Sequence, residues 1–282
     1  MSGGGPEPIA WINGRWGHPD ALCLPLSDRG LLLADGLFET VLVEQGQPRL
    51  LAEHLARWRE SAALLAMAPP PGAAELEPLL AEAVARSGIR QGALRLNWSR
   101  GSPLHGGRGI DLPAATCHRF WLQLSPCQPL FSSLRARISP IERRSAGLLS
   151  RCKTLAYGGA IQARREARAA GADEALLLGE GGQLCCGSTA NLLVRRGNRW
   201  LTPPLASGCL PGVMRGRALA LGLAEEAEIQ LEQLWRWRQA PGGDHQGSCL
   251  LLNSLGCRPL SSLNDMALPT TPPELLWQAI TR

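Results

Sequence analysis

A short segment rich in proline and serine, SPCQPLFSS at 125–133, divides the chain into two halves of similar character. In both halves, short apolar runs bounded by turn residues are followed or flanked by longer helical patterns. Runs of strands with flanking helices, in two halves, indicate a two-domain α+β architecture, and 282 residues suffice for two domains of ordinary size. We therefore expect an N-terminal α/β domain over 1–125, a linker over 126–133 and a C-terminal domain over 134–282.

Hydrophobic spacing predicts the main elements of each half. In the first half, FETVLVEQGQPRLL, with a turn near Gly46, ALRLNWSRG and CHRFWLQLSP predict strands. LAEHLARWRESAALLAM predicts a helix that the PPPG sequence at 69–72 ends. A second helix should follow and end at Gly88. In the second half, EALLL, QLCC, NLLVRR, RWLTPP and SCLLLNSLG predict strands, with helices at AIQARREARAAG, near PGVMRGRALALGL and near 224–237.

Composition argues against several classes of protein. The formal net charge is only +5, and the arginine pairs are scattered along the chain, so we expect no nucleic-acid partner. No signal-peptide pattern opens the sequence and no run approaches about 20 apolar residues, so we expect a cytoplasmic protein without a membrane partner. Nine cysteines without a framework spacing indicate reduced, buried thiols, and no metal site is expected.

One lysine stands out. Of the 29 lysine and arginine residues, only Lys153 is a lysine, and Tyr157 is the only tyrosine of the chain. Arginine can supply solubility and ion pairs, but its guanidinium stays protonated and cannot act as a nucleophilic amine. The sequence therefore indicates that an amine is needed at Lys153; codon bias with one surviving surface lysine is the alternative.

Five motifs in order give the chain a family resemblance. They are LSDRGLLLADGLFET at 26–40, EHLARWRESA at 53–62, RCKTLAYGGAIQARREA at 151–167, STANLLVRRGN at 188–198 and LPGVMRGRAL at 210–219. Together they resemble the class IV pyridoxal-phosphate enzymes, which include branched-chain and D-amino-acid aminotransferases and 4-amino-4-deoxychorismate lyases. The resemblance implies a D-amino-acid aminotransferase-like fold of two α/β domains, pyridoxal 5'-phosphate as cofactor, and a homodimer in which the partner helps to close the site.

The resemblance also assigns roles to three residues that hold the cofactor. Lys153 would bind pyridoxal phosphate covalently and later move protons at the substrate carbon. Tyr157 would donate a hydrogen bond to the ring oxygen of the cofactor, with a core tyrosine as the alternative. Arg57 resembles the phosphate-binding arginine, because a planar guanidinium suits a dianion; periodicity alone would equally allow an exposed face of a helix.

A second group of residues would complete the phosphate site. The proline–glycine turn of LPGVMRG would direct the N–H groups of Val213 and Met214 at an anion from the start of a helix. Asn253 and Ser254, after the strand of LLNSLG, resemble the position that completes this site. A simple capping role is the alternative for both.

The choice of reaction rests on weaker signals. The loop SRGSPLHGGRGIDLP resembles that of the lyases, in which Arg108 would bind a substrate carboxylate, and NSLGCRPL resembles the lyase ending. Thr40, in FETV, lies on a motif that commonly lines the pocket. We expect a lyase that converts 4-amino-4-deoxychorismate, a small carboxylate, to 4-aminobenzoate and pyruvate for folate biosynthesis. A branched-chain or D-amino-acid aminotransferase and a non-catalytic pyridoxal-phosphate-binding paralogue are the alternatives.

Cys186 departs from the family pattern. Five residues before the asparagine of ANL, the family normally has a glutamate that bonds the pyridine nitrogen and keeps it protonated, whereas this chain has Cys186. No aspartate or glutamate occurs from Gly181 to Ala224 to replace it. A neutral thiol is a weak hydrogen-bond partner, so transamination should suffer most. The lyase reaction gains from aromatisation of its product and should tolerate the change better, although a degenerate enzyme is the other interpretation.

Overall fold

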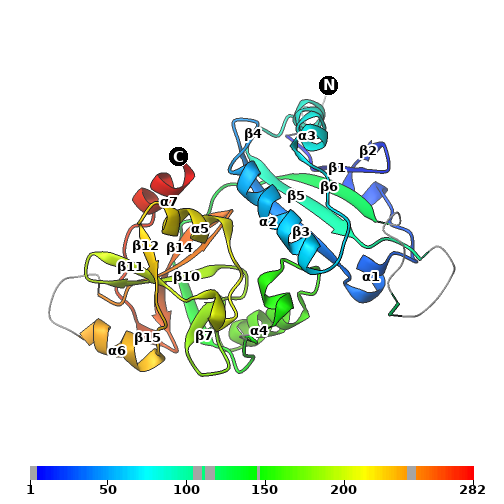
Figure 1. The fold of residues 1–282 in the computed structure, drawn as a ribbon. Coiled ribbons are helices and arrows are strands. Elements are labelled where there is room, and N and C mark those ends of the chain that lie inside the picture. The colour runs from blue at the N-terminus through cyan, green and yellow to red at the C-terminus, as the bar shows by residue number, and fades with distance from the viewer. Residues whose placement is uncertain (1–4, 104–109, 112–117, 145–146, 240–245) are drawn as a thin grey trace. The chain divides into compact units, whose positions relative to one another are not determined.

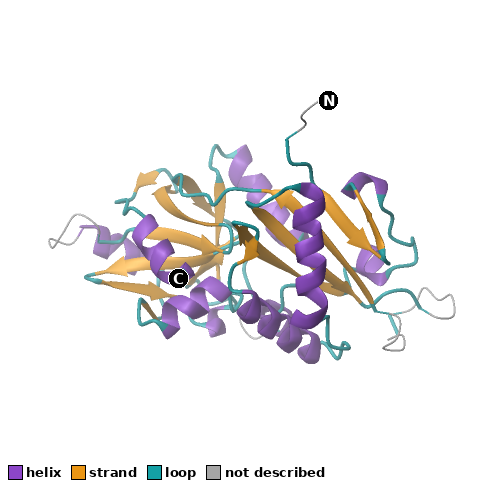
Figure 2. Cartoon of the chain, turned by 90° about the horizontal axis from the view of Figure 1, so that it is seen from above, coloured by secondary structure: helices purple, strands orange, loops and turns teal. Residues whose placement is uncertain are grey.

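The computed structural model describes residues 5–103, 110–111, 118–144, 147–239 and 246–282. The chain forms two compact units: unit 1 is Met1–Gln128 with Cys152–Ala156, and unit 2 is Pro129–Arg151 with Tyr157–Arg282. Each unit has its own sheet and its own hydrophobic core (Figure 1). Figure 2 shows strands gathered into sheets, with helices packed against them. The predicted α+β class is confirmed.

Unit 1 is a six-stranded antiparallel sheet with two long helices against one face. Its strands, in the order β2-β1-β6-β5-β3-β4, are β1 (Ile9–Ile12), β2 (Arg15–Gly17), β3 (Gly36–Glu44), β4 (Gln47–Pro48), β5 (Gly92–Ser99) and β6 (Arg119–Pro126). Its helices are the short η1 (Pro19–Ala21) and α1 (Arg29–Leu33) and the long α2 (Leu51–Leu64) and α3 (Ala73–Ser87). The backbone of Gly88 is left-handed (φ 69°) and ends α3 where the sequence predicted.

Side chains of β3 alternate between the two faces of this sheet. Leu37 and Val41 point to the core, where Leu55 and Trp58 of α2 meet them. The register pairs Phe38 with Asn97 of β5 and Thr40 with Arg95, so these four side chains share the opposite face.

Unit 2 is built on a nine-stranded sheet. Its strands are β7 (Leu134–Ile138), β8 (Glu174–Leu178), β9 (Leu184–Gly187), β10 (Asn191–Arg196), β11 (Arg199–Thr202), β12 (Ala224–Glu226), β13 (Cys249–Asn253), β14 (Gly256–Leu263) and β15 (Met266–Ala267). The path β10-β13-β14-β7-β8-β9 closes on itself, because β9 also pairs with β10. The helices are η3 (Leu148–Arg151), α4 (Gly158–Ala169), η4 (Leu205–Ser207), α5 (Val213–Ala220), α6 (Leu231–Gln239) and α7 (Glu274–Thr281). None of the described helices combines the length and the apolar character needed to cross a membrane.

The segment Cys152–Ala156 belongs to unit 1, whereas the sequence-based division assigned all of 134–282 to the second domain. The reason is main-chain pairing with β3. The N–H of Phe38 donates to the carbonyl of Lys153 (2.9 Å), the N–H of Leu155 donates to the carbonyl of Gly36 (2.9 Å), and Leu37 pairs with Thr154. Such pairing joins residues more than 100 positions apart, which no local pattern reveals.

Candidate functional site

Lys153 is held beside the ring of Phe38. The hydrogen bond from the Phe38 N–H fixes its backbone against β3, and its Nζ lies 4.4 Å from the centroid of the Phe38 ring. A cation at this distance from a ring face is attracted by the ring quadrupole. The single amine that the sequence singled out is therefore fixed at one defined place in unit 1.

Arg95, which the sequence did not single out as functional, lies over the same ring. Its guanidinium carbon is 3.8 Å from the Phe38 centroid, and its Nε donates to Oδ1 of Asn97 (2.8 Å). Thr40 is its register partner on β3 and shares its face. The alternation of ALRLNWS could have identified Arg95, because it places Arg95 on the face away from Leu94 and Leu96. A guanidinium beside a lysine amine offers a carboxylate two donors within one region of the sheet.

Arg57 lies on the other face of β3, in a buried ion pair with Glu39. Its Nε donates to Oε1 of Glu39 (2.8 Å) and its Nη2 to Oε2 (2.5 Å), while Nδ1 of His54 lies 2.7 Å from Oε2. Burial alone would raise the pKa of Glu39, but the Arg57 charge and the hydrogen bonds from His54 and Arg57 lower it to about 2. The exposed-helix interpretation of Arg57 is therefore wrong.

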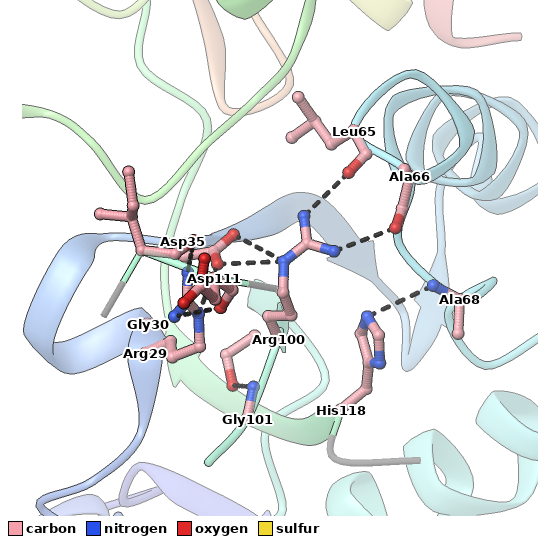
Figure 3. A network of polar contacts seen from close by, with 12 residues as sticks. Arg29, Gly30, Asp35, Leu65, Ala66, Ala68, Arg100, Gly101, Asp111 and His118 are labelled. Atoms are coloured by element: carbon pink, nitrogen blue, oxygen red, sulfur yellow. Dashed lines mark hydrogen bonds and ion pairs between the residues drawn. The ribbon is translucent and has the colours of Figure 1, made fainter. Parts of the chain in front are cut away.

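Arg29 binds the two described segments of the glycine-rich loop, at Gly101 and at residues 110–111. Its backbone N–H donates to the carbonyl of Gly101 (2.8 Å), and its Nη1 and Nη2 donate to the carbonyls of Asp111 and Ile110 (3.1 and 3.4 Å). Figure 3 shows the network around it. Arg108, the predicted carboxylate ligand, lies outside the described residues.

Asp35 links this anchor to the end of α2. It accepts from Nε of Arg29 (2.8 Å) and from Nε of Arg100, whose Nη1 and Nη2 reach the carbonyls of Ala66 and Leu65 (3.0 and 2.8 Å; Figure 3). A cation at the C-terminal end of a helix satisfies unpaired carbonyls and complements the helix dipole. Asp35 and Arg100 thus connect Arg29 to the residues that follow α2.

In unit 2, α5 begins at Val213, its N-cap residue is Gly212, and no side chain caps it. Nδ2 of Asn191 donates to the carbonyl of Leu210 (2.9 Å) just before the helix, and a Cβ atom on Gly212 would lie 2.0 Å from Oδ1 of Asn191. Only glycine fits there. Val213 and Met214 are the first two residues of this helix, as predicted, and their N–H groups lie at its positive end.

The side chain of Asn253 stabilises a turn. Its Oδ1 accepts from the N–H of Leu255 (2.8 Å) and its Nδ2 donates to the carbonyl of Thr189 (3.3 Å), between β13 and β14. Asn253 thus orders the turn between the two strands and caps no described helix, and Ser254 follows in the same turn. Tyr157 immediately precedes α4, where its carbonyl accepts from the N–H of Ile161 (2.9 Å).

The two adjacent cysteines lie at a β-bulge. Leu178 pairs with Leu184 but Leu177 pairs with Cys186, so Cys185 is the extra residue on β9. Both thiols are buried against alanines of α4, with Sγ atoms 3.7 Å apart, and Cys185 donates to Cys186. That hydrogen bond lowers the pKa of Cys186 against the effect of burial, with help from the Arg143 charge, and raises the pKa of Cys185.

A carboxylate does approach this segment, from the neighbouring strand β8, which lies before Gly181 in the sequence. Glu174 of β8 accepts from the Oγ of Ser188 (2.5 Å) and from its N–H (3.3 Å). It is also ion-paired with Arg164 of α4, which donates to Oγ1 of Thr189 (3.0 Å). This carboxylate therefore orders the turn that follows Cys186.

Comparison with known proteins identifies the family. A model of the family described as amino-transferase class IV matches residues 36–263, most of the chain. The chain belongs to the class IV aminotransferases. The resemblance and the fold expected from the sequence are confirmed, as is pyridoxal phosphate as the cofactor of this enzyme.

Relatives of the chain within this family have different activities in their names. A putative branched-chain-amino-acid aminotransferase of Methanocaldococcus jannaschii is 27% identical over 227 residues, 79% of this chain and 78% of the relative. The aminodeoxychorismate lyase of Bacillus subtilis is 29% identical over 211 residues, 73% and 71% of the two chains. The crystal structure of 4-amino-4-deoxychorismate lyase from Pseudomonas aeruginosa is 30% identical, with a TM-score of 0.76 and 96% of each chain covered.

Within each unit, described residues fit one part of pyridoxal phosphate. In unit 1, the amine of Lys153, fixed against an aromatic ring, can bond an aldehyde. In unit 2, no side chain caps the start of α5, and a helix N-terminus of this kind can bind a phosphate.

We expect Gly212→Ala to destabilise unit 2 and weaken cofactor binding. The added Cβ must displace the Asn191 side chain, which breaks its bond to Leu210. The free energy of unfolding should fall by about 1–3 kcal/mol. Gly216→Ala, in the same helix and with no atom near its added Cβ, should be neutral or stabilising by up to about 1 kcal/mol. Urea unfolding and cofactor titration of both variants check this; equal behaviour would contradict it.

Proposed function

We propose that this enzyme is a lyase that converts 4-amino-4-deoxychorismate to 4-aminobenzoate and pyruvate in folate biosynthesis. The observation that carries the substrate class is the shared position of Lys153 and Arg95 at the ring of Phe38. It supports a substrate that has an amine to exchange with Lys153 and a carboxylate to bind Arg95. Lyases of this name are among the relatives of the chain.

Cys186 favours the lyase over an aminotransferase. When bound, pyridoxal phosphate withdraws electrons from the carbon that carries the substrate amine, and a protonated ring nitrogen strengthens this effect. In the proposal Cys186 occupies the place of the acid that would hold that proton. Loss of pyruvate makes the remaining ring aromatic, so the lyase reaction depends less on a strong electron sink than transamination does.

Each site residue has its own role in the proposed reaction. Lys153 would hold the cofactor through its amine, and that amine would accept the proton of the ring carbon that carries nitrogen. The electron pair of this C–H bond completes the aromatic ring as the C–O bond breaks. The enolpyruvyl group leaves as the enolate, which takes up the proton from Lys153 and becomes pyruvate. Arg95 and, by resemblance, Arg108 orient carboxylates. By resemblance, Arg57 of unit 1 would be a ligand of the phosphate. In unit 2, the N–H groups of Val213 and Met214 and Ser254 would also be phosphate ligands, and Tyr157 would bond the ring oxygen.

A direct assay tests the reaction. Purified enzyme with 4-amino-4-deoxychorismate should release 4-aminobenzoate and pyruvate in equal amounts. A parallel incubation with amino acids and 2-oxoglutarate should form new keto acid only slowly. Rapid keto-acid formation without any 4-aminobenzoate would instead establish the branched-chain or D-amino-acid aminotransferase, and neither product would favour the non-catalytic paralogue.

We further propose that the enzyme is a homodimer. The contact between the two copies is provided by α1 and by Leu26 before it. Leu26, Leu31, Leu32 and Leu33 are 83%, 55%, 63% and 49% exposed. Four exposed leucines within eight positions are typical of a surface that a partner covers. These residues belong to LSDRGLLLADGLFET, the motif that also contains Thr40.

Replacing Leu31 and Leu32 together by glutamate should shift the enzyme from dimer to monomer, because two charges cannot be buried in an apolar contact. Light scattering after size-exclusion chromatography measures the molar mass. Leu275→Glu, at a leucine of α7 that is 79% exposed, serves as the control and should leave the mass unchanged. A double variant that stays dimeric would contradict the assignment of this surface.

A further inference from the structure

Glu39, His54 and Arg57 form a buried charged cluster on the face of β3 opposite to Phe38. Glu39 and His54 are each 1% exposed, and both oxygens of the carboxylate are engaged: Oε1 by Nε of Arg57, and Oε2 by Nη2 of Arg57 and Nδ1 of His54. His54 and Arg57 are three residues apart on α2, so they lie on the same helix face. The cluster joins the helix to the strand beneath it.

The cluster has a defined arrangement of protons. The pKa of Glu39 is about 2, so its carboxylate is ionised at any ordinary pH. An ionised carboxylate only accepts hydrogen bonds, so the proton of the contact with His54 is on Nδ1. Glu39 therefore accepts three hydrogen bonds, two from one guanidinium, and this fixes the plane of that guanidinium.

Burying a charged cluster costs free energy of desolvation, so a role other than filling the core is expected for it. Replacing buried ion pairs by apolar residues is often neutral or stabilising, so such a pair is weak evidence for a role in stability. An arginine side chain loses rotamer entropy when it is immobilised. If the guanidinium is already fixed in the folded protein, a ligand that binds it does not bear that loss.

We propose that Glu39 and His54 are positioning residues for the phosphate of the cofactor. They hold the guanidinium of Arg57 by its Nε–Nη2 edge, which sets the direction in which Nη1 is presented to the phosphate. This inference rests on the proposed function, in which Arg57 binds the phosphate. Because Glu39 cancels the charge of Arg57, the fixed direction of the N–H groups, rather than net charge, provides the binding.

Two substitutions separate direction from charge. Glu39→Asp keeps the charge but shortens the side chain by one methylene, so it cannot reach both guanidinium nitrogens as before. Glu39→Gln keeps the length but removes the charge. If Glu39 acts by positioning, Glu39→Asp weakens the binding of pyridoxal phosphate by roughly tenfold or more, since small misplacements of a binding group are costly.

The measurement compares two ligands on the dialysed apoenzyme. Dissociation constants for pyridoxal phosphate and for pyridoxal, which lacks the phosphate, are obtained by absorbance titration. Glu39→Asp should weaken only the phosphorylated ligand. Glu44→Asp is the matched control, because Glu44 lies on the same strand and pairs with an arginine, Arg49 (3.1 Å), near the surface; it should change neither constant.

Two results would contradict the inference. Wild-type affinity for pyridoxal phosphate in Glu39→Asp, or tighter binding in Glu39→Gln, would overturn the inference, since Glu39 would then act by charge or compete with the phosphate. If the wild-type enzyme binds both ligands equally, the proposed function of Arg57 fails instead. Circular dichroism verifies folding. Should Glu39→Asp not fold, His54→Leu, which removes only the third hydrogen bond, should weaken pyridoxal phosphate alone by about threefold or more.

Discussion

Replacing Lys153 by alanine should abolish the covalent attachment of pyridoxal phosphate and reduce 4-aminobenzoate formation by about 10²–10⁴-fold or more. No other lysine side chain exists in the chain to take its place. The amine is held at the Phe38 ring by a main-chain hydrogen bond, so a neighbouring residue cannot replace it by a small movement. Borohydride reduction of the wild-type enzyme followed by peptide mapping should find the cofactor on Lys153, and on no peptide of the variant.

Lys153→Arg is the matched control for this experiment. Arginine keeps the positive charge and its attraction to the Phe38 ring, but its guanidinium remains protonated and cannot act as a nucleophile or base. If the amine itself is needed, the arginine variant should be as inactive as the alanine variant while it retains the fold. Substantial activity in Lys153→Arg would show that only a cation is required, and the proposed role of Lys153 would fail.

The elements that the sequence predicted well are those whose determinants are local. The alternation around Leu94 and Leu96 predicted β5, because one face of that strand packs against the core. The helix that ends at Gly88 was predicted from a pattern contained within the helix and from the glycine after it. Periodicity and capping are properties of a few neighbouring residues, so a single sequence reveals them.

In the region after α5, the local pattern did not predict the structure. The helical pattern over 224–237 predicted one helix, but Ala224–Glu226 forms β12 and α6 begins only at Leu231. The strand exists because Ala224 pairs in parallel with Trp200 of β11. That partner is distant in sequence, and tertiary pairing outweighs the local preference for helix.

In the candidate site, too, the sequence predicted only part of what the structure shows. Residue type pointed to Lys153 and Arg57, because a lone amine and a motif arginine are visible in the sequence. Their partners were not visible: Glu39 is 18 positions from Arg57, and Phe38 is joined to Lys153 only by the pairing of distant segments. The sequence thus indicates which groups are available for chemistry, and the fold decides which of them are held, buried or ion-paired.

Cys186→Glu should change the absorption spectrum of the bound cofactor and increase keto-acid formation from amino acids by roughly tenfold or more, because a carboxylate holds a protonated ring nitrogen where a thiol does not. The Arg143 charge that helps to lower the pKa of Cys186 would also keep the new carboxylate ionised. The larger side chain enters a close-packed cluster of alanines at the β-bulge, so the free energy of unfolding should fall by about 1–3 kcal/mol.

Cys186→Gln separates the effect of charge from the effect of size. Glutamine has nearly the volume of glutamate and should destabilise the bulge to a similar extent, but it cannot keep a pyridine nitrogen protonated. A spectrum that changes with glutamate and not with glutamine would place residue 186 at the ring nitrogen. If both variants keep the wild-type spectrum and reaction preference, Cys186 does not contact the ring, and the preference for the lyase must then come from the substrate-binding arginines.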